Sequence, residues 1–203
     1  MVARNLEGRL IAGRLVVARI LPVETALVRE RLKAALQESG ADVILSLGQA
    51  SGRAAVGLER VAVNVLNFEQ PDNAGVMLAK TPITRGGPDA RIANLPFDEI
   101  VSRWASDGIP GYVSSSAGTY ICNQVLYEAL GLAEEAGSPL CAGFVHLPVL
   151  PQQAVSVGPE STPSMSLDLM SRAVENLLEV LIPWAQNRNG APPHSNIKEE
   201  VTL

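Results

Sequence analysis

The chain has few of the residues that mark several classes of protein. Among its 203 residues there are two cysteines, Cys122 and Cys141, two histidines, three Phe, three Tyr and two Trp. Two cysteines cannot form a disulfide framework, and without histidines at ligand spacing they are too few for a zinc site. We therefore expect both cysteines to be free thiols.

Long apolar runs and clusters of basic residues are also missing. No apolar run approaches the roughly 18 residues that span a bilayer. The net charge is −5, and Lys and Arg do not cluster, which argues against nucleic acid as a partner. The first eight residues are polar and include Arg4 and Glu7, so they do not have the charged-then-apolar order of a secretory signal. We expect a soluble cytoplasmic protein that does not bind membranes and that acts on small molecules or peptides.

Short apolar runs alternate with segments of helical period. Runs rich in Val, Ile and Leu are typical of buried strands, and they lie at 15–21, 43–47, 61–66 and 143–147. Segments with apolar residues on one helical face lie at 24–39, 97–106, 120–136 and 166–185. This order predicts an α/β fold, a three-layer sandwich with a mostly parallel or mixed central sheet flanked by helices.

One domain accounts for most of the chain. The length suits a single core, which we place at residues 1–186. Residues 187–203 contain Pro, Gly, Asn and charged residues without periodicity, and they predict a flexible tail that includes His194. The turn-rich stretch 69–96 is long for a loop, and such loops often cover a site or a subunit contact.

Cys122 lies in "SAGTYICNQVLY", where a Gly-Thr turn precedes the predicted helix 120–136. Backbone N–H groups in the first turn of a helix stabilise negative charge, so this position would lower the pKa of the thiol and favour a nucleophile. The alternative is a small apolar side chain packed against the sheet.

His146 is the candidate base for such a nucleophile. It is the only histidine outside the tail, and it ends the apolar strand of "CAGFVHLPVLP". Ligands of open α/β sheets bind at the carboxyl ends of strands, although a structural histidine is the alternative. Cys141 lies five residues earlier, so it should point to the opposite face of the sheet and fill the core.

Glu59 is the candidate third member of a catalytic set with Cys122 and His146. It lies in "GQASGRAAVGLERVAVN", after a Gly-rich loop and before the predicted strand 61–66. A buried carboxylate can orient an imidazole and stabilise its protonated form. The alternative is a surface glutamate paired with Arg60.

The same three segments carry a resemblance to a known family. "GQASGR" with "ERVAVN", "SSSAGTYICN" and "GFVHLPVLP" resemble the signature regions of pyroglutamyl peptidase I, also called pyrrolidone-carboxylate peptidase. The resemblance extends from about Leu15 through the last predicted helix and includes "PDN", "GIP" and "SMSLDLM". It implies that Glu59, Cys122 and His146 are the catalytic carboxylate, nucleophile and base.

The implied reaction is hydrolysis of the amide bond after an N-terminal pyroglutamyl (5-oxoproline) residue of a peptide. The resemblance implies no metal and no cofactor, and relatives are commonly homo-oligomers. Two other functions are compatible with the residues. One is a catalytically impaired homologue that binds a small amide or an assembly partner, and the other is a thiol amidase with a different acyl specificity.

The sequence departs from the family pattern at three places. Nothing like the usual opening strand and "TGFxPFGG" loop, whose aromatic residues hold the lactam ring, precedes Leu15. Without that strand, a sheet edge or a core face is left uncovered. Glu69 in "EQPDN" replaces an arginine, which would tend to raise the pKa of a nearby thiol. Gly57 stands two residues before Glu59, where the family has Ser or Thr.

Overall fold

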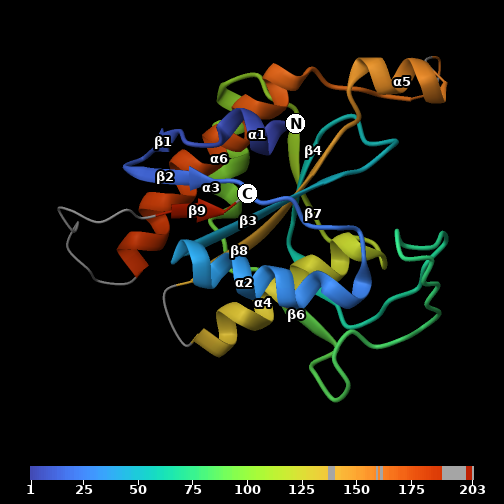
Figure 1. Cartoon of the computed structure of the whole chain (residues 1–203). Coiled ribbons are helices and arrows are strands. Elements are labelled where there is room, and N and C mark those ends of the chain that lie inside the picture. Colours follow the sequence, from blue (N-terminus) through green and yellow to red (C-terminus); the bar gives the residue numbers. More distant parts are fainter. Residues whose placement is uncertain (137–139, 159, 161, 189–199, 203) are drawn as a thin grey trace.

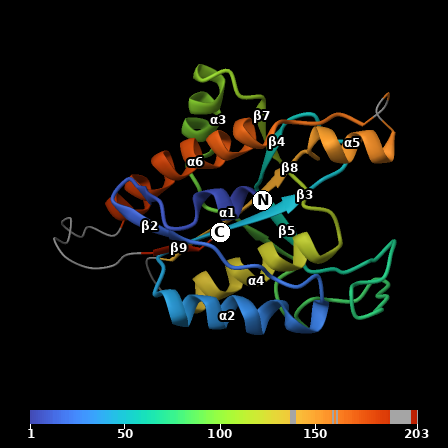
Figure 2. The ribbon, with the colours of Figure 1, turned by 45° about the horizontal axis from the view of Figure 1, so that its top comes forward.

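The protein is a sheet sandwiched between two layers of helices. The computed structural model describes residues 1–136, 140–158, 160, 162–188 and 200–202. Helices α2 (Val28–Ser39) and α4 (Ile121–Ala136) cover one face of the sheet, whereas α1 (Val2–Leu6), α3 (Phe97–Ser106) and α6 (Leu167–Arg188) cover the other (Figures 1 and 2). The predicted three-layer α/β sandwich is confirmed.

Among the described residues, the main sheet has seven strands in the order β1-β2-β9-β3-β8-β4-β7. Their bounds are β1 Leu10–Ile11, β2 Arg14–Val17, β3 Val43–Gln49, β4 Val56–Glu59, β7 Gly111–Ser114, β8 Cys141–Leu147 and β9 Glu200–Thr202. The central pair β3 and β8 is parallel over seven residues each, from Val43 opposite Cys141 to Gln49 opposite Leu147. Because β4 is antiparallel to β8 and parallel to β7, the sheet is mixed.

Several strands differ from the sequence prediction, and the one expected at 15–21 is β2, which already ends at Val17. The strand expected at 61–66 is short, β5 (Val61–Val63), and pairs with β6 (Ala90–Ile92) in a separate two-stranded sheet. The main sheet instead contains β4, so Glu59 also ends a strand, two residues before β5 begins. Neither β4 nor β7 has a long apolar run, because each is only four residues long and contains a glycine.

The long helices agree well with their predicted ranges. The helix predicted at 24–39 begins later, at Val28, and α6, predicted at 166–185, continues to Arg188. Leu181, Ile182 and Ala185 are buried in these last turns, and their packing holds the helix together. Two short helices were not predicted, α1 and α5 (Pro151–Val157), and a 3-10 turn (Thr25–Leu27) precedes α2.

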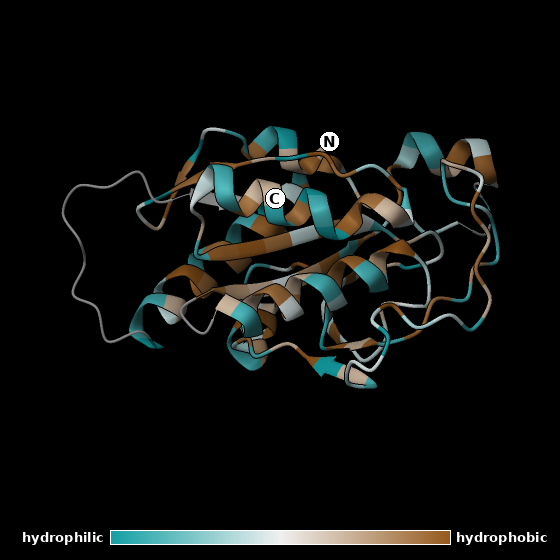
Figure 3. Ribbon diagram, turned by 60° about the horizontal axis from the view of Figure 1, so that its bottom comes forward, coloured by the Kyte–Doolittle hydropathy of each residue, from teal (hydrophilic) through white to brown (hydrophobic). Residues whose placement is uncertain are grey.

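Apolar residues of the strands and of both helical layers form one buried core cluster, and the ribbon in Figure 3 shows hydrophobic stretches in both the strands and the helices. Leu45 and Val145 of the central strands are fully buried, and so is Trp104 of α3, whose indole N–H donates to the Ala173 carbonyl at 2.8 Å. In the part of the chain that the structure describes, no helix is long and apolar enough to cross a membrane.

The predicted tail lies largely outside the described residues. Positions 189–199 and 203, including His194, are not described. Residues 200–202 form β9, which pairs in parallel with β2 and with the first two residues of β3.

Candidate active site

Strand register places the candidate residues on one face of the sheet. His146 in β8 lies opposite Gly48 of β3 and opposite Gly57 of β4. Residues in register project to the same face. A Cβ atom built on Gly48 would lie 3.0 Å from the Sγ of Cys122, so the thiol is on the face to which His146 points. The thiol and the imidazole therefore lie on the same side of the sheet, although His146 is not among the residues that line the cavity at Cys122.

Glu59 is bonded to His146. Its Oε1 lies 2.7 Å from Nδ1 of the imidazole, and both side chains are buried. The alternative of a surface pair with Arg60 is wrong, because Glu59 has no exposed surface and the Arg60 guanidinium stacks on the ring of Phe97 at 4.6 Å. The contact leaves Nε2 as the imidazole nitrogen that can act on a thiol.

Arg53 contacts the candidate site, although the sequence reasoning did not single it out. Its Nη1 donates to the same Oε1 of Glu59 at 2.7 Å, and its Nη2 donates to the Ser116 carbonyl at 3.2 Å. A Cβ atom on Gly57 would lie 2.5 Å from this Nη1. The glycine that departs from the family pattern thus leaves the space that the Arg53 guanidinium occupies.

The environment of Glu59 favours the ionised carboxylate. Burial by itself would raise its pKa, but the hydrogen bond from His146 and the contacts with Ser114 and Arg53 outweigh burial, and the pKa of Glu59 lies below its ordinary value. Glu59 is therefore a negatively charged carboxylate where it contacts the imidazole.

The thiol of Cys122 is harder to ionise than its helix position predicted. Burial, followed by the negative charge of Glu59, raises the pKa of Cys122 to about 11, against weaker opposing effects of its own backbone amide and of Arg53. The prediction of a lowered thiol pKa is wrong because desolvation outweighs the helix terminus. Glu69 is exposed and is not among the groups that shift this pKa.

The start of α4 is held by side-chain bonds to β5 and to the segment that follows it. Asn123, fully buried, accepts from the Val63 amide at 2.9 Å and donates to the Val63 and Val65 carbonyls. The Tyr120 hydroxyl donates to the Pro71 carbonyl at 3.1 Å. These bonds position the first turn, and with it the thiol, although nothing in the sequence pattern distinguished Asn123 from other polar residues.

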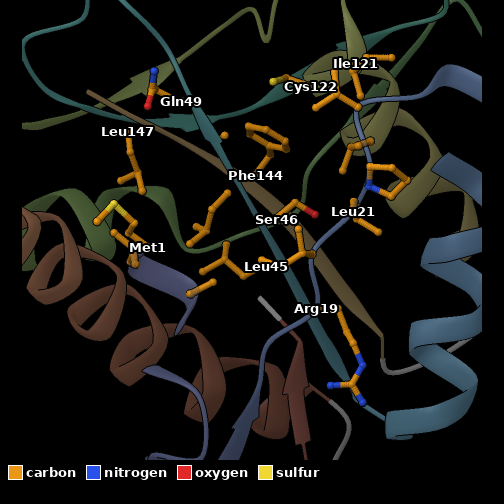
Figure 4. A pocket seen from close by; sticks show the side chains of 18 of the residues that line it. Met1, Arg19, Leu21, Leu45, Ser46, Gln49, Ile121, Cys122, Phe144 and Leu147 are labelled. Atoms are coloured by element: carbon orange, nitrogen blue, oxygen red, sulfur yellow. The ribbon is translucent and has the colours of Figure 1, made fainter. Parts of the chain in front are cut away.

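The thiol opens on a cavity of about 910 Å³ (Figure 4). Phe144 lines it beside Cys122, and its ring centroid lies 4.8 Å from that of His146. Among the described residues no hydrogen bond joins the thiol to the imidazole directly. The site thus has a bonded carboxylate and imidazole, with a thiol on the same face at the wall of a ligand-sized cavity.

Cys141 has a different environment. It begins β8 and is buried, and strand alternation directs it to the face opposite His146, where α6 lies. Burial raises the pKa of this thiol, and the charge of Arg188 only partly offsets that effect. Its expected place in the core agrees with the structure.

The fold and these side chains together define a cysteine-type hydrolase on an α/β sandwich. The model of the pyroglutamyl peptidase family matches residues 1–183, and the chain belongs to this family. The resemblance seen in the sequence motifs is thereby confirmed.

Relatives of known name cover most of the chain. The pyrrolidone-carboxylate peptidase of Pyrococcus furiosus is 36% identical over 187 residues, which are 89% of this chain and 90% of that protein. The pyrrolidone-carboxylate peptidase of Klebsiella pneumoniae is 40% identical over 182 residues, 89% of this chain and 83% of that protein. The crystal structure of the P. furiosus enzyme superimposes with a TM-score of 0.87 at 35% identity, covering 91% of this chain and 89% of that one.

Proposed function

We propose that the protein hydrolyses the amide bond that follows an N-terminal pyroglutamyl residue of a peptide. Cys122 is the nucleophile, His146 the general base and acid, and Glu59 the group that orients the imidazole. The observation that carries this proposal is the 2.7 Å contact between Glu59 and His146 on the same sheet face as the thiol. Neither a cofactor nor a metal ion takes part in the proposed steps.

Proton transfer accompanies the attack. With a pKa of about 11, only about one thiol in ten thousand is ionised at pH 7, so a preformed thiolate is scarce. His146 accepts the thiol proton as sulfur bonds to the substrate carbonyl carbon. The Glu59 carboxylate holds Nδ1 protonated and stabilises the imidazolium that results.

Collapse of the tetrahedral intermediate completes acyl transfer. The C–N bond breaks, and the imidazolium of His146 protonates the leaving amine. A water molecule, deprotonated by His146, then attacks the thioester, which releases pyroglutamate and restores the thiol. We assign oxyanion stabilisation to backbone N–H groups at the start of α4, next to Cys122.

The two cysteines provide a matched test. Purified protein is incubated with a fluorogenic pyroglutamyl amide, alongside Cys122→Ala and Cys141→Ala. The parent and Cys141→Ala should hydrolyse the amide, and Cys122→Ala should lose at least about 10³-fold in kcat/KM, as enzymes do without their nucleophile. A folded parent without activity would contradict the proposal, and hydrolysis of other acyl amides alone would indicate a different thiol amidase.

Two further expectations remain predictions. We propose that the enzyme acts in the cytoplasm and forms a homo-oligomer. Light scattering of the purified protein, with a mass above the 21.5 kDa of one chain, would support the second of these.

A further inference from the structure

The two oxygens of the Glu59 carboxylate have different surroundings. Oε1 lies 2.7 Å from Nη1 of Arg53 and 2.7 Å from Nδ1 of His146. Oε2 is buried, and among the described residues it has no hydrogen-bond partner. A buried carboxylate oxygen that has lost its hydration gains much from a donor, so a hydroxyl within reach of Oε2 can change the behaviour of the whole group.

Strand register brings a hydroxyl, that of Ser114, to this carboxylate. Strands β4 and β7 are parallel, and Glu59 lies opposite Ser114, just as Gly57 lies opposite Tyr112. Because residues in register project to the same face, the Ser114 side chain lies on the face that carries Glu59 and His146. Ser114 is only 6% exposed, and Glu59 has no exposed surface. The hydroxyl and the carboxylate are therefore enclosed together on neighbouring strands.

The Ser114 hydroxyl is held only weakly by its neighbours in the chain. It donates to the Ser116 carbonyl at 3.3 Å and accepts from the Ser116 amide at 3.4 Å. Both bonds are long, since O–H···O bonds cluster near about 2.7–2.8 Å. The same carbonyl also accepts from Nη2 of Arg53 at 3.2 Å, so it keeps a donor if the hydroxyl turns away. A carboxylate is the stronger acceptor for the single hydroxyl proton.

The electrostatics of the site agree with this geometry. Burial raises the pKa of Glu59, whereas His146, Ser114 and Arg53 lower it, in that order of size. The groups that face the carboxylate include His146 from β8, Arg53 from the turn before β4 and the thiol of Cys122 from α4, whose own pKa responds to the charge of Glu59. Ser114 is the neutral donor in this set, and it lies on the strand opposite Glu59.

We propose that Ser114 is a positioning residue for the reaction, whose hydroxyl donates to Oε2 of Glu59 while His146 carries the proton of the thiol. The proposal rests on the function proposed above and deepens it. With Arg53 on Oε1 and Ser114 on Oε2, the carboxylate stays an anion and the proton stays on the imidazolium. This proton then passes from Nε2 to the leaving amine as the C–N bond breaks. Without the hydroxyl, Oε2 is more basic, and Glu59 competes for the proton that the amine needs.

A matched pair of substitutions tests the hydroxyl separately from packing. Ser114→Thr and Ser114→Val have nearly the same shape, but only threonine can donate a hydrogen bond. With the fluorogenic pyroglutamyl amide, kcat/KM should stay close to the parent in Ser114→Thr. It should fall about 10- to 100-fold in Ser114→Val and Ser114→Ala, chiefly through kcat. Ser116→Ala is the control, because it keeps the Ser116 carbonyl. Equal losses in the Thr and Val variants would assign the effect to packing and overturn the proposal.

The pH profile of kcat/KM is a readout that a purely structural role would not move. Its acid limb follows the titration of Glu59 and His146 as a coupled pair. Loss of the donor makes the carboxylate more basic, so the limb should lie at higher pH in Ser114→Ala and Ser114→Val than in the parent. Ser114→Thr should restore its position. A lower kcat/KM with an unmoved acid limb would overturn the proposal.

A measurement that needs no catalysis separates this proposal from the proposed function. The carboxyl ¹³C resonance of Glu59, assigned by its absence from Glu59→Gln, is titrated with pH in the parent and in Ser114→Ala. The pKa of Glu59 should be higher in Ser114→Ala than in the parent. An unchanged pKa overturns the proposal even if the parent is active. If the pKa rises although the folded parent does not hydrolyse the amide, the bond between Ser114 and Glu59 is supported and the proposed function is not.

Discussion

Arg53 and Glu59 form an ion pair at the oxygen that also binds His146. The Arg53 Nη1 and the His146 Nδ1 each lie 2.7 Å from Oε1 of Glu59. Through its second nitrogen, Arg53 also bonds the carbonyl of Ser116, in the loop that leads to Cys122. One guanidinium therefore connects Glu59, the proposed orienting carboxylate, with the segment that leads to Cys122, the proposed nucleophile.

Arg53→Ala should reduce catalysis. Its loss removes a charged hydrogen bond from a carboxylate that has no exposed surface, and it releases the Ser116 loop. We expect kcat/KM to fall about 10- to 100-fold and the free energy of unfolding to fall by about 1–3 kcal/mol in urea titrations. Arg60→Ala is the control, because this neighbouring arginine contacts Phe97 instead. Equal losses in the two variants would contradict a specific role of Arg53.

Gly57→Ala should act through Arg53. The added methyl would lie 2.5 Å from Nη1, so the guanidinium has to move away from Glu59. The substitution should therefore lower kcat/KM about as much as Arg53→Ala, and the double variant should be no worse than either single one. A double-mutant cycle in kcat/KM measures this coupling. If the fold losses in kcat/KM of the two single variants multiply in the double variant, the two positions act independently.

The pKa of Cys122, the proposed nucleophile, is directly measurable. In a Cys141→Ala background, the rate of alkylation of Cys122 by iodoacetamide should rise with pH up to an inflection near 11. Because the charge of Glu59 helps to raise this pKa, Glu59→Gln should move the inflection to lower pH. Glu69→Gln, on the exposed loop, should leave it unchanged. If Glu69→Gln shifts the inflection and Glu59→Gln does not, the charge that raises the pKa of Cys122 belongs to Glu69 and not to Glu59.

Glu59→Gln should nevertheless be a poor enzyme. The amide cannot hold the imidazole with a negative charge, and a neutral partner can select the wrong tautomer. By analogy with serine hydrolases that lose their carboxylate, we expect kcat/KM to fall about 10²- to 10⁴-fold. If Glu59→Gln has a lower thiol pKa but also a lower kcat/KM, the loss of activity comes from poorer orientation of the imidazole and not from poorer ionisation of the thiol. Unimpaired turnover would rule out the orienting role.

Acid should destabilise the protein through Glu59. Its pKa in the folded protein is below the ordinary 4.5, so its ionised form contributes stability above that pH. This contribution is lost as the pH falls below 4.5 and through the folded pKa. Glu59→Gln should thus be less stable than the parent at pH 7 by about 1–3 kcal/mol, and the difference should narrow in acid. If urea titrations show the same difference in the free energy of unfolding between the two proteins at every pH down to 3, the ionisation of Glu59 does not contribute to stability.

Much of the fold could be predicted because its elements are long and regular. The helix at 97–106 was predicted within its observed bounds, and β3 and β8 have continuous apolar runs. The strands that position Glu59 and Ser114 were missed because four residues with a glycine carry little periodicity. Arg53 was missed for a related reason, since its pairing with Glu59 depends on the turn between β3 and β4.

The amino-acid sequence by itself determined the layered α/β architecture, the family motifs and the identity of the thiol, the imidazole and the carboxylate. Periodicity and side-chain chemistry are local properties, so they can be read without coordinates. Only the tertiary structure decided that these groups share one sheet face, that Arg53 pairs with Glu59 and that burial raises the thiol pKa. Those properties depend on strand order and on desolvation by segments far apart in the chain, which no local pattern encodes.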